Sequence, residues 1–171
     1  MSLLKWLGFE GAREEPDPDP VANIERALGG LDPHRARHLA CFAYILTRAA
    51  RADHEITEDE EREMERLLAL RADISLEQAA PIIRIARAEA ARSAGTDDFL
   101  VTREFDGLAT HEQKLALLEC LFAVSSADDS IITAEDNEVR RIANELKIEH
   151  AEFIAVRAGH LDKLHVLKKD G

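Results

Sequence analysis

The chain has 171 residues and a mass of 19.1 kDa, enough for one domain whose core needs no disulfide or structural metal. Hydrophobic residues make up 46% of the sequence, aromatic residues 5% and charged residues 33%, a composition typical of a soluble all-α protein. The net charge of −12 repels phosphate backbones, so we expect no nucleic-acid partner. Cys41 and Cys120 lie in apolar stretches without neighbouring cations and predict buried free thiols in a reducing compartment.

The N-terminal end divides into two short segments. Residues 1–10 are amphipathic and contain a single lysine, whereas residues 11–20 form a Pro-rich acidic linker that cannot be helical. The first segment is too short for a signal peptide or a membrane span, so we predict a cytoplasmic protein. We expect the segment to dock on the body of the protein. Membrane contact by residues 3–9 is the less favoured alternative, because the segment has no basic cluster.

Residues 21–171 are predicted to form a single compact domain of seven or eight helices without strands. In chain order, the apolar periodicity predicts helices over residues 21–28 and 34–52, helices that begin after Thr57 and after Ser75, a short helix over 97–106, and helices that begin after Thr110, after Thr133 and at about His150. Each helix has one apolar stripe, which is typical of helices that surround a common core.

Three helix starts are marked by a capping box. In this motif a Ser or Thr side chain accepts a hydrogen bond from the backbone N–H three residues later, and the Glu or Gln at that position bonds back. The pairs are Thr57 with Glu60, Ser75 with Gln78, and Thr110 with Gln113. Pro33 can open the long helix, Pro81 is expected to bend or delay the helix that follows Ser75, and Gly107 is expected to end the short helix.

The sequence contains an internal repeat. A shift of 75 residues aligns two helix-turn-helix segments without a gap. The aligned pairs include Leu46 with Leu121, Asp53 with Asp128, Ile56 with Ile131, Glu60 with Glu135 and Glu63 with Glu138. We therefore expect two related helical hairpins, which face each other about an approximate twofold axis and bring their acidic turns to one edge of the domain.

These acidic turns resemble a known family. Residues 52–60, Ala-Asp-His-Glu-Ile-Thr-Glu-Asp-Glu, and residues 127–131, Ala-Asp-Asp-Ser-Ile, are each followed by further glutamates. Together they are similar to the duplicated Asp-x-x-Ile signature of the TerB-like family of tellurite resistance proteins. The resemblance covers about Arg37 to Leu146. It implies an all-helical domain with no known catalytic reaction, a role in bacterial tellurite or chemical-stress response, and metal binding through the matching acids. The two turns differ in detail, because Thr57 aligns with Ile132.

The acids offer a metal site. Asp53, Glu60, Asp128 and Glu135 could supply four carboxylates to a divalent cation of the Ca²⁺ or Mg²⁺ class. Helix capping explains Glu60 without any ligand. Asp53 and Asp128, in contrast, lie where core-facing stripes end, and a partly buried carboxylate needs hydrogen bonds or a cation.

Other chemistries are less well supported. A loop that begins at Asp53 is no EF-hand, because Glu58 stands where Gly is needed and Met64 where a bidentate Glu is needed. None of the seven histidines has a Glu three residues before it, and catalytic motifs such as HExxH are absent, so we predict no enzymatic activity. His34 and His38 are spaced to hold a transition metal, but beside arginines they are expected to be surface residues.

Two functions are consistent with these features. The first is a non-enzymatic stress-response or tellurite-resistance protein that binds a divalent cation or a protein partner through its acidic face. The alternative is a metal-independent helical adaptor whose acidic face binds a basic protein partner. In both, the acidic run Glu58–Glu65 is expected to form a solvated helix face.

Overall fold

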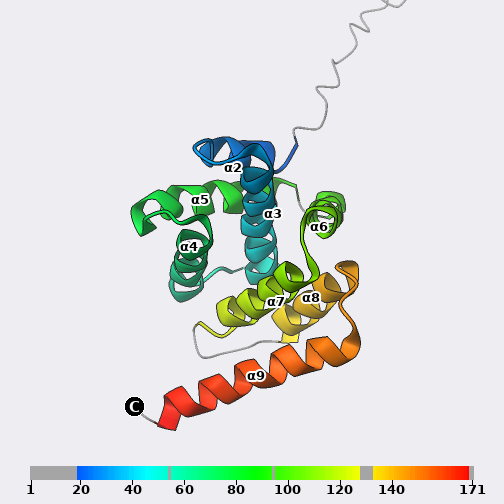
Figure 1. Cartoon of the computed structure of the whole chain (residues 1–171). Helices are drawn as coiled ribbons and strands as arrows, with labels where there is room; N and C mark the ends of the chain where they lie inside the picture. The colour runs from blue at the N-terminus through cyan, green and yellow to red at the C-terminus, as the bar shows by residue number, and fades with distance from the viewer. Residues whose placement is uncertain (1–18, 54, 94, 128–132, 170–171) are drawn as a thin grey trace, which may run out of the picture.

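The computed structural model describes residues 19–53, 55–93, 95–127 and 133–169. Over these ranges the chain forms eight α-helices, one 3-10 helix and no strand, as predicted (Figure 1). The helices are α2 (Ala22–Ala27), α3 (Pro33–Ala50), the 3-10 helix η1 (Arg51–Asp53), α4 (Glu58–Ala72), α5 (Leu76–Arg92), α6 (Thr96–Leu108), α7 (His111–Ser125), α8 (Thr133–Glu145) and α9 (His150–Lys169). The amphipathic segment 1–10 and all but the last two residues of the linker 11–20 lie outside the described residues, so their proposed docking or membrane contact stays a prediction.

All three predicted capping boxes are present. In each, the Ser or Thr hydroxyl accepts from a backbone N–H and the Glu or Gln side chain accepts from the backbone N–H of the capping residue. The two bonds measure 3.2 and 2.8 Å for Thr57 with Glu60, 3.1 and 3.0 Å for Ser75 with Gln78, and 3.2 and 2.8 Å for Thr110 with Gln113. The helix starts are therefore fixed by local side chains.

Pro81 does not delay α5, which begins at Leu76 and continues through the proline, and the alternative of a bend at Pro81 stays a prediction. One predicted helix end is wrong. Gly107 does not end α6, which continues to Leu108. The chain leaves α6 through extended backbone at Ala109, with φ −94° and ψ 145°, so this helix end needs no residue in the left-handed region.

Helix α3 lies at the centre of the fold (Figure 1). Thirteen of its 18 residues are buried, and every residue from Leu39 to Ala50 is among them. The helices that contact it are α2, α4, α5, α6, α7 and α8. Because α3 is surrounded on all sides over its last three turns, even its polar residues there, Thr47 and Arg48, are buried.

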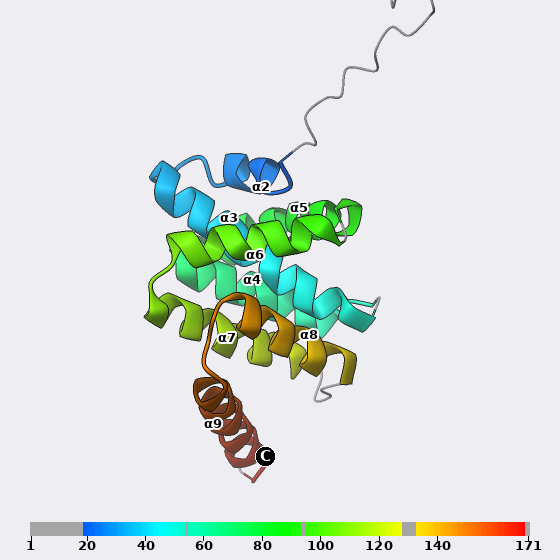
Figure 2. The same ribbon diagram turned by 90° about the vertical axis from the view of Figure 1, so that its right-hand side faces the viewer.

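The two predicted hairpins correspond to α3–α4 and α7–α8, and they are packed into one another. Helices α3 and α7 are in contact, α4 packs against both of them, and α8 also packs against both. This reciprocal packing fits the expected repeat, although the twofold relation itself stays a prediction. Helix α9 packs on α7 and extends away from the other helices (Figure 2). No helix in the described ranges is long and apolar enough to cross a membrane.

Candidate functional site

Glu60 is the third residue of α4, and only 1% of its surface is exposed. Its Oε2 atom accepts hydrogen bonds from the backbone N–H of Thr57 at 2.8 Å and from the Thr57 hydroxyl at 3.1 Å. Its Oε1 atom is also buried, but no donor in the described part of the chain bonds to it. The capping box therefore accounts for one carboxylate oxygen. The other oxygen is desolvated without compensation, which is unfavourable unless a cation or a donor meets it.

The structure describes the other three predicted ligands, Asp53, Asp128 and Glu135, to different extents. Glu135 is the third residue of α8, the position that Glu60 has in α4, and it is 3% exposed. The backbone of Asp53 ends η1, which packs against α8. The Asp53 side chain and the whole of Asp128 lie outside what the structure describes. The structure thus places two buried glutamates in equivalent first turns, and joint ligation by all four acids stays a prediction.

The described residues alone do not complete a metal site. Within the ranges 19–53, 55–93, 95–127 and 133–169, no group of three or more His, Cys, Asp or Glu side chains could hold a metal ion. A site at Glu60 and Glu135 would need further ligands, and the predicted ones, the side chains of Asp53 and Asp128, lie outside what the structure describes. Such a set of oxygen ligands suits a hard cation such as Ca²⁺ or Mg²⁺.

A buried arginine beside these turns was missed by the sequence analysis. The Arg48 side chain is 3% exposed, and its guanidinium donates to Glu138 at 2.6 Å and to Glu145 at 2.7 and 3.1 Å. It also donates to the Thr102 hydroxyl at 2.8 Å. Burial by itself lowers the pKa of Arg48, but the bonds to Glu145 and Glu138 outweigh burial and raise it. Arg48 therefore stays charged and joins α3 to α6 and α8.

The 3-10 turn that carries Asp53 is held by Asp98 of α6. The Arg51 guanidinium lies 3.1 Å from both carboxylate oxygens of Asp98. The Tyr44 hydroxyl donates to the same carboxylate at 2.8 Å. Burial and the adjacent Asp98 both raise the pKa of Tyr44, so its hydroxyl remains a donor. These contacts tie η1 to α6, and the backbone of η1 also packs against α8.

The amino-acid sequence of this region identifies the family. Residues 38–158 match the family model for Tellurite resistance protein TerB, and this match covers most of the chain. The chain belongs to the TerB family. The matched region contains all four predicted ligands and extends further towards the C-terminus than the resemblance seen in the sequence. No curated protein and no solved structure matches the chain.

The acidic run of this TerB-family chain is only partly a solvated face. Glu60 within it is buried, and so is Met64. Several of the other acids are paired with arginines. These pairs are Glu58 and Asp59 with Arg62 at 3.4 and 3.5 Å, Glu63 with Arg66 at 2.6 Å and Glu61 with Arg87 at 2.6 Å. The acidic face is therefore partly neutralised by the protein itself.

Both cysteines are buried free thiols, as predicted. Burial raises the pKa of Cys41 to about 12, which makes its thiol unreactive. Burial also raises the pKa of Cys120. The expectation that no cation lies near is wrong for Cys120, because the Arg71 guanidinium lies 3.6 Å from its sulfur. The two residues are 49 positions apart, so the sequence did not reveal the contact.

The two histidines of α3 differ in their surroundings. His34 is exposed, as expected, whereas His38 is half-buried. The His38 ring stacks on Phe105 with a centroid distance of 4.9 Å, and its Nε2 atom is buried without a partner in the described residues. The sequence did contain a signal for this position: His38 lies four residues before Phe42, on the core-facing stripe of α3.

Proposed function

We propose that this TerB-family chain is a non-enzymatic protein of tellurite resistance or chemical-stress response. In this proposal it binds a divalent cation of the Ca²⁺ or Mg²⁺ class through Asp53, Glu60, Asp128 and Glu135. Family membership supports the tellurite-resistance role. The observation that supports cation binding is the buried Oε1 atom of Glu60, which has no donor among the described residues.

The protein would contribute orientation and charge to such a site. Thr57 holds Oε2 of Glu60 through two hydrogen bonds, which fixes the plane of the carboxylate and leaves Oε1 for a ligand. Arg48 holds α8 through Glu138 and Glu145, and so fixes the helix that carries Glu135. A bound cation would supply positive charge to several carboxylates that otherwise repel one another.

The alternative proposal is a metal-independent adaptor that binds a basic protein partner. It is supported by the net charge of −12 and by the exposure of acids at the start of α4, where the Glu58 and Asp59 side chains are 87% and 59% exposed. Charges of this kind steer a basic partner towards the surface. Under this alternative the glutamates of the first turns only cap their helices.

Glu60→Gln separates the two proposals. Glutamine should keep the capping box, because Gln78 and Gln113 form the same box elsewhere in this chain. It removes the negative charge and replaces one oxygen with an NH₂ group, which cannot bind a cation. Thermal unfolding is followed during titration with Ca²⁺, Mg²⁺, Mn²⁺ and Zn²⁺. A cation at about 100 times its Kd should stabilise the wild type by about 2.7 kcal/mol. Glu60→Gln should lose most of this gain.

Glu77→Gln is the matched control, because Glu77 is an exposed first-turn acid of α5 without an ion pair to the described residues. Its response to each cation should equal that of the wild type. If the wild type responds to none of the four ions, or if Glu60→Gln responds as the wild type does, cation binding at Glu60 is excluded and the adaptor is favoured.

A further inference from the structure

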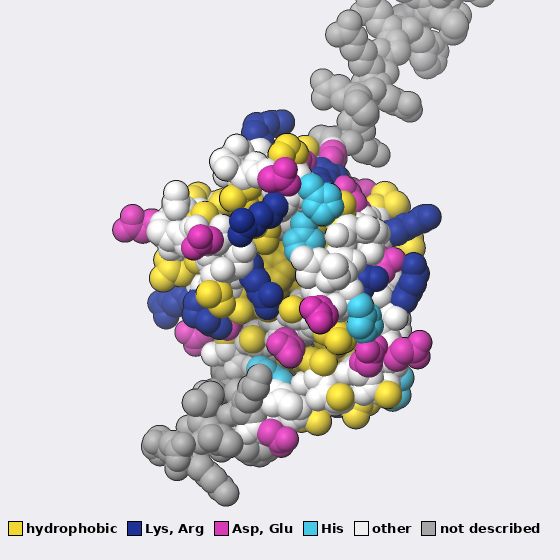
Figure 3. All heavy atoms as spheres, viewed as in Figure 1, with side chains coloured by type: hydrophobic (Ala, Val, Ile, Leu, Met, Phe, Trp, Pro, Cys, Tyr) yellow, Lys and Arg dark blue, Asp and Glu magenta, His cyan; other side chains and the backbone are white. Residues whose placement is uncertain are grey.

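A separate cavity lies at the other end of α4 from Glu60. Its volume is about 270 Å³, and residues of α3, α4, α6 and α7 line it. Its floor is apolar and buried, and includes Phe42, Phe105 and Leu117. Near the middle of the face in Figure 3, hydrophobic side chains form the floor of a hollow flanked by Lys or Arg and by His side chains. This combination of an apolar floor and a few polar groups is typical of small-molecule sites.

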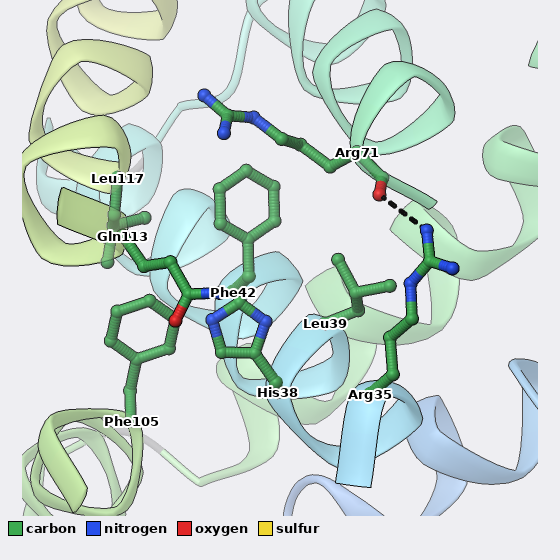
Figure 4. Close-up of a pocket in the computed structure, with 8 residues that line it drawn as sticks. All are labelled: Arg35, His38, Leu39, Phe42, Arg71, Phe105, Gln113 and Leu117. Carbon is green, nitrogen blue, oxygen red and sulfur yellow. Dashed lines mark hydrogen bonds between the residues drawn. The ribbon is translucent and has the colours of Figure 1, made fainter. Parts of the chain in front are cut away.

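The rim of the cavity is positively charged. Arg35 and Arg71 both line it, and neither forms an ion pair with a carboxylate of the described residues. Arg35 donates to the backbone oxygen of Arg71 at 3.3 Å, and Arg71 lies 3.6 Å from the Cys120 sulfur. Figure 4 shows the Arg71 side chain above the ring of Phe42 and the Arg35 side chain to one side. In a protein with a net charge of −12, two arginines without acidic partners beside one cavity indicate an anionic ligand.

His38 adds a polar atom that lacks a partner. Its ring lies between Arg35 and Phe105 in Figure 4 and stacks on Phe105. Its Nε2 atom is buried and has no hydrogen-bond partner in the described part of the molecule. Burial, His34 and Arg71 lower the pKa of His38, so the ring is neutral at pH 7 and adds no charge of its own. The neutral ring leaves the positive charge of the rim to Arg35 and Arg71.

We propose that this cavity binds a small organic carboxylate with a planar apolar body, in the class of benzoate. Arg71, whose side chain lies above the ring of Phe42, would bind the carboxylate, and Arg35 would add positive charge on the opposite side of the rim. The ring of the ligand would lie against Phe42 and Phe105. An inorganic oxyanion would use the arginines but leave the apolar floor uncovered. Because most ligand pockets measure about 300–1,000 Å³, a cavity of this size suits a single ring. The proposal is independent of the cation site.

Three probes test the ligand class on the intact chain of 171 residues. Calorimetric titration with benzoate should show saturable binding with a Kd on the order of 1 mM or below. Benzamide has the same shape without the charge, and inorganic phosphate has the charge without the ring. Each should bind at least about tenfold more weakly than benzoate. Benzamide loses the charge-assisted hydrogen bonds, which are about twice as strong as neutral ones. Phosphate loses the contact with the apolar floor.

Two variants test the residues. Arg71→Gln should weaken benzoate binding by about tenfold, because it removes a charge-assisted bond. Arg35→Gln should weaken it by only about twofold, because it removes a charge on the opposite side of the rim. Both side chains are on the rim, so both variants should fold, and thermal unfolding verifies this. Arg84→Gln is the control, since Arg84 is an exposed residue of α5 without an ion pair to the described residues, and its Kd should equal that of the wild type.

Several outcomes would overturn the proposal. Absence of saturable benzoate binding would exclude the site, and equal binding of benzamide would exclude a role for the charge. Tighter binding of phosphate than of benzoate would assign the cavity to inorganic oxyanions instead. Wild-type affinity in both Arg35→Gln and Arg71→Gln would show that benzoate binds elsewhere on the protein.

Discussion

The buried guanidinium of Arg48 shows how much one residue can contribute to this fold. Replacement by Met would leave Glu138 and Glu145 partly buried without their main cation. Breaking a buried ion pair in this way costs about 3–5 kcal/mol, because the remaining charges stay desolvated. We therefore expect Arg48→Met to lower the free energy of unfolding by about this amount in urea or guanidinium titrations.

Arg141→Met is the appropriate control for Arg48→Met. Arg141 also pairs with Glu138, at 3.4 Å, but its side chain is 68% exposed. An exposed pair contributes about 0–1 kcal/mol. Similar losses in the two variants would show that burial does not strengthen the Arg48 contacts.

Variants of Asp53 provide a second test, after Glu60→Gln, of whether these acids bind a cation or only cap a helix. If Asp53 is a cation ligand, Asp53→Asn should lose most of the cation-induced stabilisation, and the cation-free variant should be no less stable than the wild type. If Asp53 instead bonds to a helix start, Asn should replace it almost without effect, whereas Asp53→Ala should cost about 0.5–2 kcal/mol with or without the cation. Thermal unfolding with and without divalent ions measures both. An identical response of wild type and Asp53→Asn to every ion would remove Asp53 from the site.

The sequence predicts where a helix begins better than it predicts where the helix ends or which residues its side chains contact. The capping boxes at Thr57, Ser75 and Thr110 involve residues only three positions apart, so their signal is local. The end of α6 depends on the extended backbone of Ala109, and the glycine at position 107 did not predict that conformation. The surroundings of Arg48 depend on residues up to 97 positions away.

The candidate sites likewise combine local motifs, which the sequence predicts, with contacts between distant residues, which it does not. The position of Glu60 in a first turn followed from the Thr57 motif, but the burial of Oε1 depends on packing between helices. The cavity beside His38 combines residues from four helices. No spacing in the sequence brings Arg35 next to Arg71, because only the packing of α3 against α4 does so.

The left-handed residue that ends α4 allows a prediction about the stability of this helix end. Asp73 follows the helix with φ 56° and ψ 50°, in the left-handed region, and the next N–H, from Ile74, donates to Ala69 at 3.1 Å. Glycine adopts this conformation without steric cost. Asp73→Gly should therefore stabilise the protein by about 0.5–1 kcal/mol, whereas Asp73→Val should destabilise it by about 1–2 kcal/mol. Denaturant unfolding measures both, and a loss of stability in Asp73→Gly would show that the Asp side chain itself stabilises the turn.

For the whole molecule, Asp106 links three parts of the chain. Its carboxylate accepts hydrogen bonds from Lys114 of α7 and, at 2.8 Å, from Lys147 after α8. These bonds lower the pKa of Asp106 below its ordinary value of 3.8. The stabilisation is therefore fully present above about pH 4 and is lost as the pH falls through the lower pKa of the folded state.

Asp106→Asn tests this linkage. At pH 7 the variant should be less stable than the wild type by on the order of 1 kcal/mol, and the difference should shrink as the pH falls below about 3. Unfolding in urea at several pH values measures it. Asp162→Asn, at an exposed position of α9 without an ion pair to the described residues, should show no such difference. A difference for Asp106→Asn that does not change with pH would mean that the lysines do not act through the charge.

The reciprocal packing of α3–α4 with α7–α8 has a consequence for synthesis of the protein. Helix α3 is complete at Ala50, but α7 and α8, which cover part of it, end only at Ser125 and Glu145. At about 5–20 residues per second, several seconds pass between the emergence of these helices from the ribosome. During that time the apolar side chains at the middle of α3 lack their final neighbours. We therefore expect the nascent chain to bind chaperones that recognise exposed hydrophobic segments. We also expect its first half to become resistant to proteases only once its second half has been made.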